Sequence, residues 1–524
     1  MPLPSAELEE LLPHAVDYLC AHGALVNQAP PHTGVAHVPF SLLPYRFPAA
    51  QLAQAEALAP LFNRLVDAVS RDAAWLHGTL AGVRASDAFT ARLLALHAEE
   101  GARAAAAAAA GAACPLQHPL RLGLHRSDYM LTAPSPASGP PALRQVELNT
   151  VASSMAGHAS AVGGMHAYLE QRHAPALPGA RAYFARSSGA APPPPSPACQ
   201  RLAAGLAAGH RAYASGRASA APGAPPPPPL VVLFVVQPAE RNVHDQRALE
   251  HELWRAHGIA VRRLGLAELG RAACAATPAT LTPHAAASAP PLLLAAPAAG
   301  AGACQEVSVV YYRAGYTPAD YPSEAEWAAR GAAEASRALK CPCLAYHLAG
   351  TKKVQQALAL AGAVERFLPS AAEAAAVRSC FAGLWSLDPA EEDAGVRGAV
   401  ARARQEPGGF VIKPQREGGG SNLFGAAIAA ALGGGMAPQE LAGHILMERL
   451  HPPVVEACMV RGGVAAVAGA SCELGVYGVY LGAGGAAEPL VNECAGTLLR
   501  TKLATSDEGG VAAGFAVIDS VMAV

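Results

Sequence analysis

Apolar residues recur at three- and four-residue steps through most of residues 6–113, as in ELEELLPHAVDYL, FNRLVDAVSRDAAWLHGTL and FTARLLALHAEEGARAAAAAAA. This spacing places the apolar side chains on one face of an α-helix, because a helical turn takes 3.6 residues. The pattern therefore predicts that this whole region is a layer of helices.

The apolar period changes to two in RQVELNTVASSM, residues 144–155, where Val146 and Leu148 alternate with polar residues. Such alternation is typical of a half-buried β-strand, and it places Glu147 and Asn149 on the same face. Two oxygen-bearing side chains at this spacing can reach one hard cation such as Mg²⁺. The other interpretation is a solvated strand face, which half-buried sheets also produce.

Residues 230–312 combine strand and helix patterns. Three segments are typical of strands: LVVLFVV (230–236), IAVRRL (259–264) and VSVVYY (307–312). One segment between the first two, DQRALEHELWRAHG (245–258), is typical of a helix that ends at glycine. The order strand, helix, strand predicts a parallel sheet. ERN (240–242) and RAGY (313–316) then follow strands at the carboxyl edge, where such sheets bind ligands, although ordinary loop polarity also explains these residues.

Two tracts are rich in alanine, proline and glycine: residues 174–229, before this unit, and residues 269–303, before its last strand. Proline runs such as APPPPSP have stiff polyproline character and little apolar surface to bury. We therefore expect both tracts to be low-complexity insertions in loops.

The stretch FVIKPQREGGGSNLF, residues 410–424, has the composition of a phosphate site. A strand rich in apolar residues carries Lys413, and Glu417 is followed by three glycines. A lysine neutralises phosphate charge, a carboxylate can bind Mg²⁺, and glycines let backbone N–H groups approach phosphate oxygens. The alternative is an ordinary glycine-rich turn between two strands.

Two further segments bring basic side chains together. LAGTKKVQQALA opens a helix with Lys352 and Lys353 in its first turn, where lysines oppose the helix dipole and a bound anion would offset the cost. An exposed lysine pair is the alternative. In LLRTKLATSDEGGVAAGFAV, Arg500 and Lys502 alternate and so share a face, and the following small residues can form a mobile loop over a ligand.

Charge, cysteines and motifs exclude several classes of function. The 524 residues carry 38 Lys and Arg against 40 Asp and Glu, and no basic run is long enough to follow a nucleic acid backbone. The 11 cysteines show no CxxC pair or zinc spacing, which favours reduced thiols in the cytoplasm. We predict no membrane segment, because proline and glycine interrupt the longer apolar stretches. The motifs of P-loop NTPases, protein kinases, GxSxG hydrolases and HExxH proteases are absent from the sequence.

A series of sequence blocks occurs in order from residue 126 to the end of the chain: RSDYM, VELNTVASSM, ERNVHDQRALE, YYRAGY, LAGTKKVQQ, KPQREGGGSNLF, ELGVYGVYL and LLRTKLATSDEGGVAAGFAV. Together they resemble the eukaryotic type of glutathione synthetase, a member of the ATP-grasp superfamily. The resemblance covers nearly the whole chain apart from the Ala/Pro-rich tracts. It implies a homodimeric ligase that joins γ-glutamylcysteine to glycine through an acyl phosphate, with ATP as co-substrate and two Mg²⁺ ions.

The fold implied by this resemblance is an ATP-grasp fold, of α/β and α+β type, with an inserted parallel-sheet substrate domain, a lid and a helical N-terminal layer. Residues 1–229 would form the N-terminal layer and part of the main body. Residues 230–347 would form the substrate-binding domain, and residues 348–524 the ATP-binding body, with a lid at about residues 385–470.

The resemblance also implies a set of site residues. The catalytic residues expected are Arg126, Lys352, Lys413 and Arg500, and the metal ligands are Glu147, Asn149 and Glu417. The ATP-binding residues expected are Glu147, Lys352, Lys413, Gln415, Glu417, Gly418, Gly419, Gly420, Asn422, Phe424, Met447, Glu448, Arg449, Leu450, Glu473, Lys502 and Glu508. The substrate-binding residues expected are Arg126, Val151, Ala152, Ser153, Ser154, Glu240, Arg241, Asn242, Gln246, Arg313, Ala314, Gly315, Tyr316, Arg500, Val511 and Ala512.

Four positions depart from the pattern of the family. Ala152, Ala314, Phe424 and Glu508 stand where serine, aspartate, tyrosine and aspartate are usual. We expect weaker binding of one ligand rather than inactivity, since a single hydrogen bond contributes ~0.5–1.5 kcal/mol.

Three functions are weighed from the sequence. The small residues Val511 and Ala512 favour glycine as the acceptor of a glutathione synthetase. A homoglutathione-type or other ATP-grasp carboxylate–amine ligase is one alternative. An ATP-binding scaffold without catalysis is the other, because a shared fold does not by itself imply a shared function.

Overall fold

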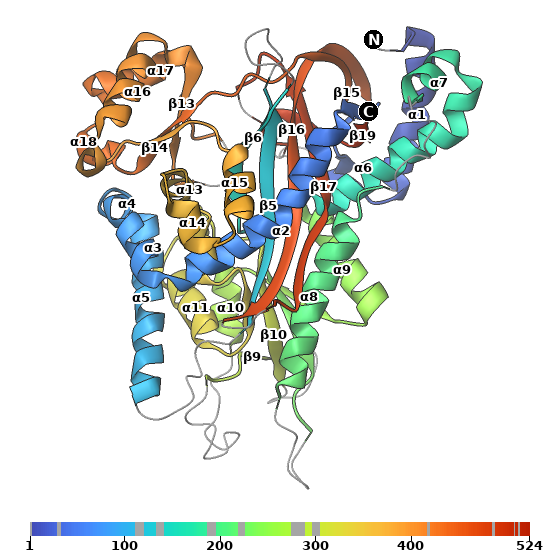
Figure 1. Ribbon diagram of the computed structural model, residues 1–524. Coiled ribbons are helices and arrows are strands. Elements are labelled where there is room, and N and C mark those ends of the chain that lie inside the picture. Colours follow the sequence, from blue (N-terminus) through green and yellow to red (C-terminus); the bar gives the residue numbers. More distant parts are fainter. Residues whose placement is uncertain are drawn as a thin grey trace.

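The computed structural model has a mixed α/β fold (Figure 1). It describes residues 3–28, 33–109, 120–132, 141–185, 195–217, 226–273, 289–295, 304–416, 420–484, 488–507, 509–511 and 514–524. Within these ranges, no helix is both long enough and apolar enough to cross a membrane.

A seven-stranded sheet runs along the long axis of the molecule (Figure 1). Its strands, in spatial order, are β15 (Val455–Arg461), β3 (Phe40–Ser41), β18 (Ala516–Asp519), β17 (Val491–Leu503), β16 (Val464–Ala483), β5 (Leu120–Leu131) and β6 (Leu143–Asn149). The longest strand, β16, pairs antiparallel with β5 on one side and with β17 on the other. The predicted strand at residues 144–155 is confirmed for its first half, which is β6.

Pairing within this sheet brings distant segments into register. Arg126 on β5 lies opposite Asn149 on β6 and Tyr477 on β16. Glu473 on β16 lies opposite Arg500 on β17. Because paired residues of neighbouring strands lie about 4.5–5.5 Å apart, the sheet gathers charged side chains that the sequence separates by hundreds of residues.

A five-stranded sheet forms the lower half of the view in Figure 1. Its strands are β7 (Leu230–Val235), β8 (Val261–Leu264), β9 (Leu293–Ala295), β10 (Cys304–Tyr312) and β11 (Leu339–Cys341). The associated helices are α9 (Val243–His257), α10 (Leu266–Ala272), α11 (Glu324–Ala335) and α12 (Leu344–Ala349). The pairs β7–β8, β7–β10 and β10–β11 are parallel, which confirms the parallel sheet predicted from the strand, helix, strand order.

A small three-stranded antiparallel sheet lies at the upper left of Figure 1, in orange. It contains β12 (Leu384–Ser386), β14 (His444–Glu448) and β13 (Phe410–Pro414), with helices α16 (Ala394–Gln405), α17 (Ala426–Ala430) and α18 (Pro438–Leu441). Phe410, Ile412 and Leu446 pack with residues of these helices in an apolar cluster of their own. We refer to residues 384–448 as the small-sheet unit.

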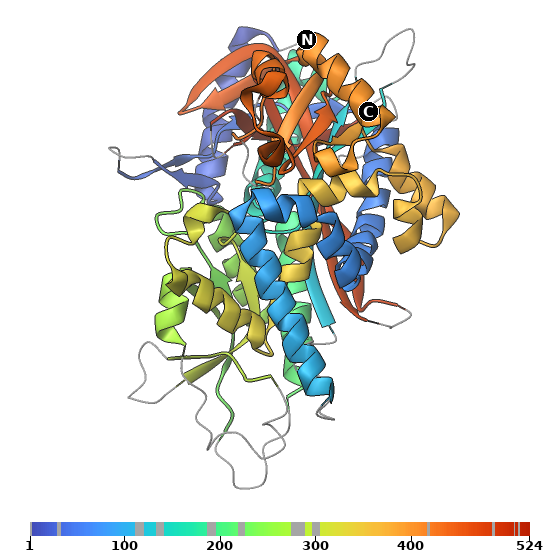
Figure 2. The same ribbon diagram turned by 90° about the vertical axis from the view of Figure 1, so that its left-hand side faces the viewer.

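The N-terminal region is less helical than predicted. Its helices are α1 (Ser5–Ala21), α2 (Ala49–Arg71), α3 (Ala73–Thr79), α4 (Ala81–Ser86) and α5 (Ala88–Ala109). The prediction of continuous helix was wrong between α1 and α2, where β1 (Leu25–Asn27), β2 (Val35–His37), β3 and β4 (Tyr45–Phe47) lie. The partner of β4 is β19 (Val521–Ala523), at the other end of the chain, so no local pattern signals this pairing. The β1–β2 hairpin, in blue, projects from the body in Figure 2.

The Ala/Pro-rich tracts also contain regular structure, contrary to the prediction of loops. The first tract contains α7 (Pro178–Phe184) and α8 (Ala198–Ser215), and the second contains β9. The remaining helices of the fold are α6 (Ala156–Tyr168), α13 (Lys352–Leu358), α14 (Ala363–Phe367) and α15 (Ala371–Ser379). A Cβ atom on Gly205 of α8 would lie 2.6 Å from the side chain of Val479 on β16. The small residues of α8 therefore permit close packing of a helix on a sheet, rather than indicating an unpacked loop.

Asp67 on α2 joins three elements of the core. Its carboxylate accepts two hydrogen bonds from Arg71, both at 2.9 Å. It also accepts hydrogen bonds from the hydroxyl of Tyr346 on α12 at 2.7 Å and from the hydroxyl of Tyr480 on β16 at 3.1 Å. These contacts hold α2 and α12 against the seven-stranded sheet.

We predict that Asp67→Asn lowers the free energy of unfolding by about 1–3 kcal/mol, because one amide cannot accept from all three partners in a buried setting. The measurement is the urea midpoint, with Asp17→Asn on the exposed face of α1 as the matched control. Equal midpoints for the two variants would show that Asp67 does not have this role.

Candidate active site

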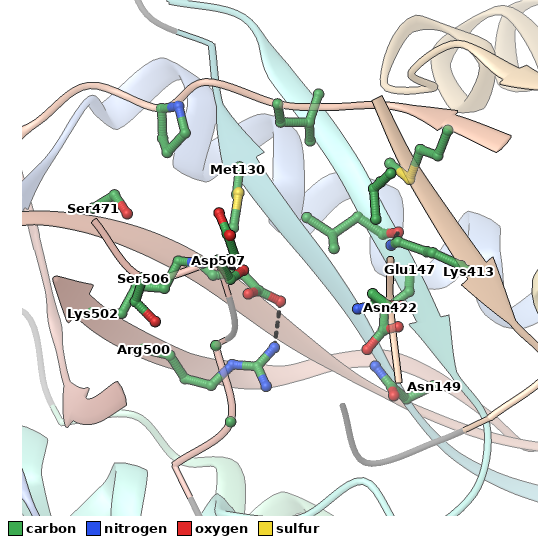
Figure 3. Close-up of a pocket in the computed structure, with 18 of the residues that line it drawn as sticks. Met130, Glu147, Asn149, Lys413, Asn422, Ser471, Arg500, Lys502, Ser506 and Asp507 are labelled. Carbon is green, nitrogen blue, oxygen red and sulfur yellow. Dashed lines mark hydrogen bonds and ion pairs between the residues drawn. The ribbon is translucent and has the colours of Figure 1, made fainter. Parts of the chain in front are cut away.

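A cavity of roughly 530 Å³ lies between the seven-stranded sheet and the small-sheet unit. Many of the residues predicted from the sequence line it: Arg126, Glu147, Asn149, Val151, Ala152, Ser154, Tyr316, Lys352, Lys413, Asn422, Phe424, Met447, Glu448, Arg449, Leu450, Glu473, Arg500, Lys502 and Val511. Figure 3 shows Arg500 and Lys502 on one side of the view, with Glu147, Asn149 and Lys413 on the other. The cavity therefore brings together cations and oxygen donors from both ends of the chain.

Other predicted residues do not line the cavity. In the described part of the chain these are Ser153, Glu240, Arg241, Asn242, Gln246, Arg313, Ala314, Gly315, Gln415 and Gly420. Glu417, Gly418, Gly419, Glu508 and Ala512 lie outside the described residues.

Two arginines of the cavity are paired with carboxylates. Arg126 donates from Nε to Asp128 Oδ1 at 2.7 Å and from Nη2 to Asp128 Oδ2 at 2.8 Å. Arg500 donates from Nη2 to the same Oδ2 at 2.8 Å and also contacts Glu473. The sequence analysis missed Asp128, although its position two residues after Arg126 on one strand was a signal that they share a face.

Pairing changes the proton affinity of these groups. Burial alone would lower the pKa of Arg126, but the nearby Asp128, Tyr477 and Glu147 together outweigh burial and the net shift is upward. Burial raises the pKa of Glu473, and the nearby Asp128 and Glu147 add to this rise, while Arg500 opposes it. The guanidinium groups therefore remain charged in the cavity.

Lysines surround Glu147. Lys352 Nζ lies 3.3 Å from Glu147 Oε2, and Lys413 Nζ donates to the carbonyl oxygen of Val146 at 3.0 Å. Burial would raise the pKa of Glu147, but Lys352 and Lys413, together with the two arginines, outweigh it and lower the pKa to about 2. Glu147 is therefore an anion at physiological pH, as a ligand of a hard cation must be.

The donor set on β6 fits a hard cation. Asn149 donates from Nδ2 to Asp128 Oδ2 at 2.9 Å and to the carbonyl oxygen of Arg126 at 3.3 Å. This leaves its amide oxygen to face the cavity, on the same strand face as the Glu147 carboxylate. Carboxylate and amide oxygens are ligands that Mg²⁺ accepts. Among the described residues, no group of three or more His, Cys, Asp or Glu is placed to bind a metal ion, so this pair would need a further ligand.

One wall of the cavity comes from the small-sheet unit and the segment that follows it. Met447 on β14 is buried, and Glu448 Oε2 accepts a hydrogen bond from the backbone N–H of Gly383 at 3.0 Å. Arg449 lies over the ring of Phe424, 5.6 Å from its centroid, and its Nη2 contacts Asp507 Oδ1 at 2.6 Å. An apolar pocket with an adjacent cation and backbone groups is suited to a flat heterocycle.

Asp245 of α9 lies beside the cavity and contacts one of the predicted substrate-binding residues, Arg313. Arg313 Nη2 contacts Asp245 Oδ2 at 3.0 Å. The same carboxylate accepts hydrogen bonds from the backbone N–H groups of Met155 at 2.9 Å and Gly157 at 2.8 Å. Asp245 therefore fixes the start of α6, directly after the cavity residue Ser154. The sequence analysis missed Asp245, because its partners are distant in sequence.

Comparison with known proteins assigns the family. A family model described as "Eukaryotic glutathione synthase, ATP binding domain" matches residues 5–523. The chain belongs to the eukaryotic glutathione synthase family. This confirms the family inferred from the sequence blocks.

Relatives and a solved structure agree with this family assignment. The chain is 38% identical to the chloroplastic glutathione synthetase of Arabidopsis thaliana, over 98% of this chain and 85% of that protein. It is also 38% identical to the glutathione synthetase of Homo sapiens, over 98% of this chain and 96% of that protein. A glutathione synthetase-like effector of Globodera pallida, solved in its apo form, has a similar fold, with a TM-score of 0.69 at 21% identity, over 100% of this chain and 98% of that one.

The two adjacent lysines of this family member have different surroundings. Lys352 lines the cavity, whereas Lys353 is buried behind it on α13. Lys353 Nζ donates to Ser386 Oγ on β12 at 2.8 Å and also pairs with Glu391. Its backbone N–H donates to Gln415 Oε1 at 3.1 Å. Lys353 therefore anchors the small-sheet unit to the rest of the molecule, which explains why this second lysine is buried.

We predict that Lys353→Met and Glu391→Gln have non-additive effects on stability, because each substitution removes the same ion pair. The double variant should lose about 0.5–3 kcal/mol less than the sum of the single losses. The measurement is thermal unfolding of all four proteins. Additive losses would show that the pair does not couple.

A second prediction concerns pH. The pKa of Glu147 is lowered from 4.5 to about 2 in the folded protein, so the ionised group contributes stability above about pH 4.5 that is lost as the pH falls toward 2. Glu147→Gln lacks this contribution. The difference in melting temperature between wild type and variant should therefore shrink between about pH 7 and pH 3. A difference that stays constant or grows in acid would contradict the assignment.

Proposed function

We propose that this chain is a glutathione synthetase that joins γ-glutamylcysteine to glycine, converting ATP to ADP and phosphate. The observation that carries the proposal is the meeting of Lys352, Lys413, Arg126 and Arg500 with Glu147 in one cavity. A ligase that activates a carboxylate with ATP needs such a site, because the phosphates and the carboxylate are all anionic. The family assignment supports the same activity.

We propose that ATP binds in the ATP-grasp manner, between the seven-stranded sheet and the small-sheet unit. Lys352 and Lys413 would contact the phosphates, and the backbone and side chains of residues 447–450 would contact the adenine. Glu147, Asn149 and Glu417 would hold two Mg²⁺ ions. When bound, Mg²⁺ would offset the triphosphate charge and polarise the γ-phosphate. The fit of the β6 oxygen donors supports this assignment.

On the peptide side, Arg126 and Arg500 would bind the cysteinyl carboxylate of γ-glutamylcysteine. This carboxylate attacks the γ-phosphorus, and the bond to the bridging oxygen breaks so that ADP leaves. The amine of glycine then attacks the acyl carbon, phosphate leaves with the bonding electrons, and the amine loses a proton. The arginines contribute by orienting the carboxylate and by offsetting the charge that builds as it reacts.

We propose that the small-sheet unit acts as a lid. Lys353 contacts this unit at Ser386, and Arg449, directly after the unit, contacts Asp507. An acyl phosphate hydrolyses readily, so closure that excludes water protects the intermediate.

The assembly and compartment are part of the proposal. We propose a homodimer, which sedimentation of the purified chain tests directly. We also propose a reducing compartment such as the cytoplasm, because the cysteines of the described residues are all free thiols. The relatives include chloroplastic proteins, so localisation of the tagged chain is the deciding measurement.

We predict that the purified chain releases ADP with γ-glutamylcysteine and glycine, and much less with β-alanine or serine in place of glycine. Preference for β-alanine would favour a homoglutathione-type ligase, and no turnover of γ-glutamylcysteine would favour another carboxylate–amine ligase.

In the same assay Lys413→Met should lower kcat/KM about a hundredfold or more, since an electrostatic contact to the transferring group is lost.

The control for Lys413→Met is Arg397→Met. Arg397 also lies in the small-sheet unit, but its side chain is 61% exposed and outside the cavity. Unchanged activity of Lys413→Met would support a non-catalytic scaffold.

A further inference from the structure

Asp128 has an unusual position in the centre of the site. Its side chain is fully buried on β5, and its two oxygens accept four hydrogen bonds from Arg126, Arg500 and Asn149. Three of these bonds go to Oδ2 alone. A carboxylate so enclosed has no surface to offer a substrate, so its role must be exerted through its three partners.

The first part of that role is electrostatic. Arg126 and Arg500 both donate to the same carboxylate, and each would repel the other without it. Burial lowers the pKa of Arg500 and repulsion from Arg126 adds to this, but Glu473 first and Asp128 second raise it, and the net shift is upward. The forked contact to Arg126 also restricts the guanidinium plane, as bidentate pairs do.

The second part concerns the amide of Asn149. An asparagine side chain can face a cavity with either its oxygen or its nitrogen, and only the oxygen can bind a cation. Because Asp128 Oδ2 accepts from Asn149 Nδ2 at 2.9 Å, the amide is held with its nitrogen inward and its oxygen outward. Asp128 thus selects the orientation that a metal ligand needs.

The backbone nearby is adapted to this arrangement. A Cβ atom on Gly475 of β16 would lie 2.8 Å from Arg126 Cδ and 2.9 Å from Asp128 Oδ1. Any side chain there would displace the pair. Glycine at this strand position therefore leaves the room that the Arg126–Asp128 contact occupies.

We propose that Asp128 is a positioning residue for the ligase reaction, which orients Asn149 toward the cation and holds Arg126 and Arg500 toward the peptide carboxylate. The inference rests on the proposed function, in which Asn149 is a metal ligand. It adds a group that contacts neither ATP nor peptide and yet controls the binding of both the cation and the dipeptide.

The test is Asp128→Asn in the full chain, with Mn²⁺ as the metal probe. Mn²⁺ binding is followed by electron paramagnetic resonance in the presence of a non-hydrolysable ATP analogue, and KM for γ-glutamylcysteine is measured separately. We expect Mn²⁺ affinity to fall about 10-fold to 100-fold, as is typical when a partner of a metal ligand is removed, and KM to rise. Asp128→Glu, which keeps the charge but moves the oxygens, should show the same loss of Mn²⁺ affinity.

The matched control is Ser127→Ala on the same strand. Ser127 is also buried, but its hydroxyl accepts from Gln145 Nε2 at 2.7 Å on the opposite face. This variant should lose stability without a change in Mn²⁺ affinity or KM, which separates positioning from a general effect on folding.

A further variant distinguishes failure of this inference from failure of the proposed function. Asn149→Ala must itself weaken Mn²⁺ binding. If it does, but the folded Asp128 variants bind Mn²⁺ and γ-glutamylcysteine like wild type, the positioning role is wrong. If Asn149→Ala binds Mn²⁺ normally, the proposed metal role of Asn149 is wrong and the inference falls with it. Absence of ligase activity in the wild-type chain would instead refute the proposed function.

Discussion

Charge balance inside one cavity is the constraint on which this structure depends. Arg126, Arg500, Lys352 and Lys413 lie where water is partly excluded, and unpaired charges in such a setting are costly. Asp128, Glu147 and Glu473 balance them. Because each carboxylate comes from a different strand, the pairing also determines how β5, β6, β16 and β17 are placed relative to one another.

The rest of the fold supports this balance. The long strand β16 pairs with β5 and β17, so Arg126 and Arg500 lie on either side of it and reach the same carboxylate. Lys353 anchors the small-sheet unit behind the cavity, while its neighbour Lys352 faces Glu147. A single turn of α13 thus combines an anchor for the proposed lid with a cation of the site.

Preorganisation is the functional consequence. The arginines and Lys352 are paired with carboxylates, and Lys413 with the carbonyl oxygen of Val146, so little reorganisation would be required when an anionic ligand binds. Ion pairing, acting against the effect of burial, also keeps these groups in the charge states that the proposed chemistry requires, with Glu147 ionised and both guanidinium groups protonated. These charge states are the ones that the proposed electrostatic activation of a carboxylate needs.

The sequence by itself determined the parts that depend on local periodicity and on motifs. The two-residue period of a strand placed Glu147 with Asn149, and the ordered blocks identified the family. Only the tertiary structure decided the rest. The pairing of β4 with β19, the packing of α8 on the sheet, the contact of Asp128 with Arg500 and that of Asp245 with Met155 all join residues that lie far apart in the sequence. Local patterns report which face a side chain occupies, whereas the identity of the group it meets is set by how the strands and helices pack.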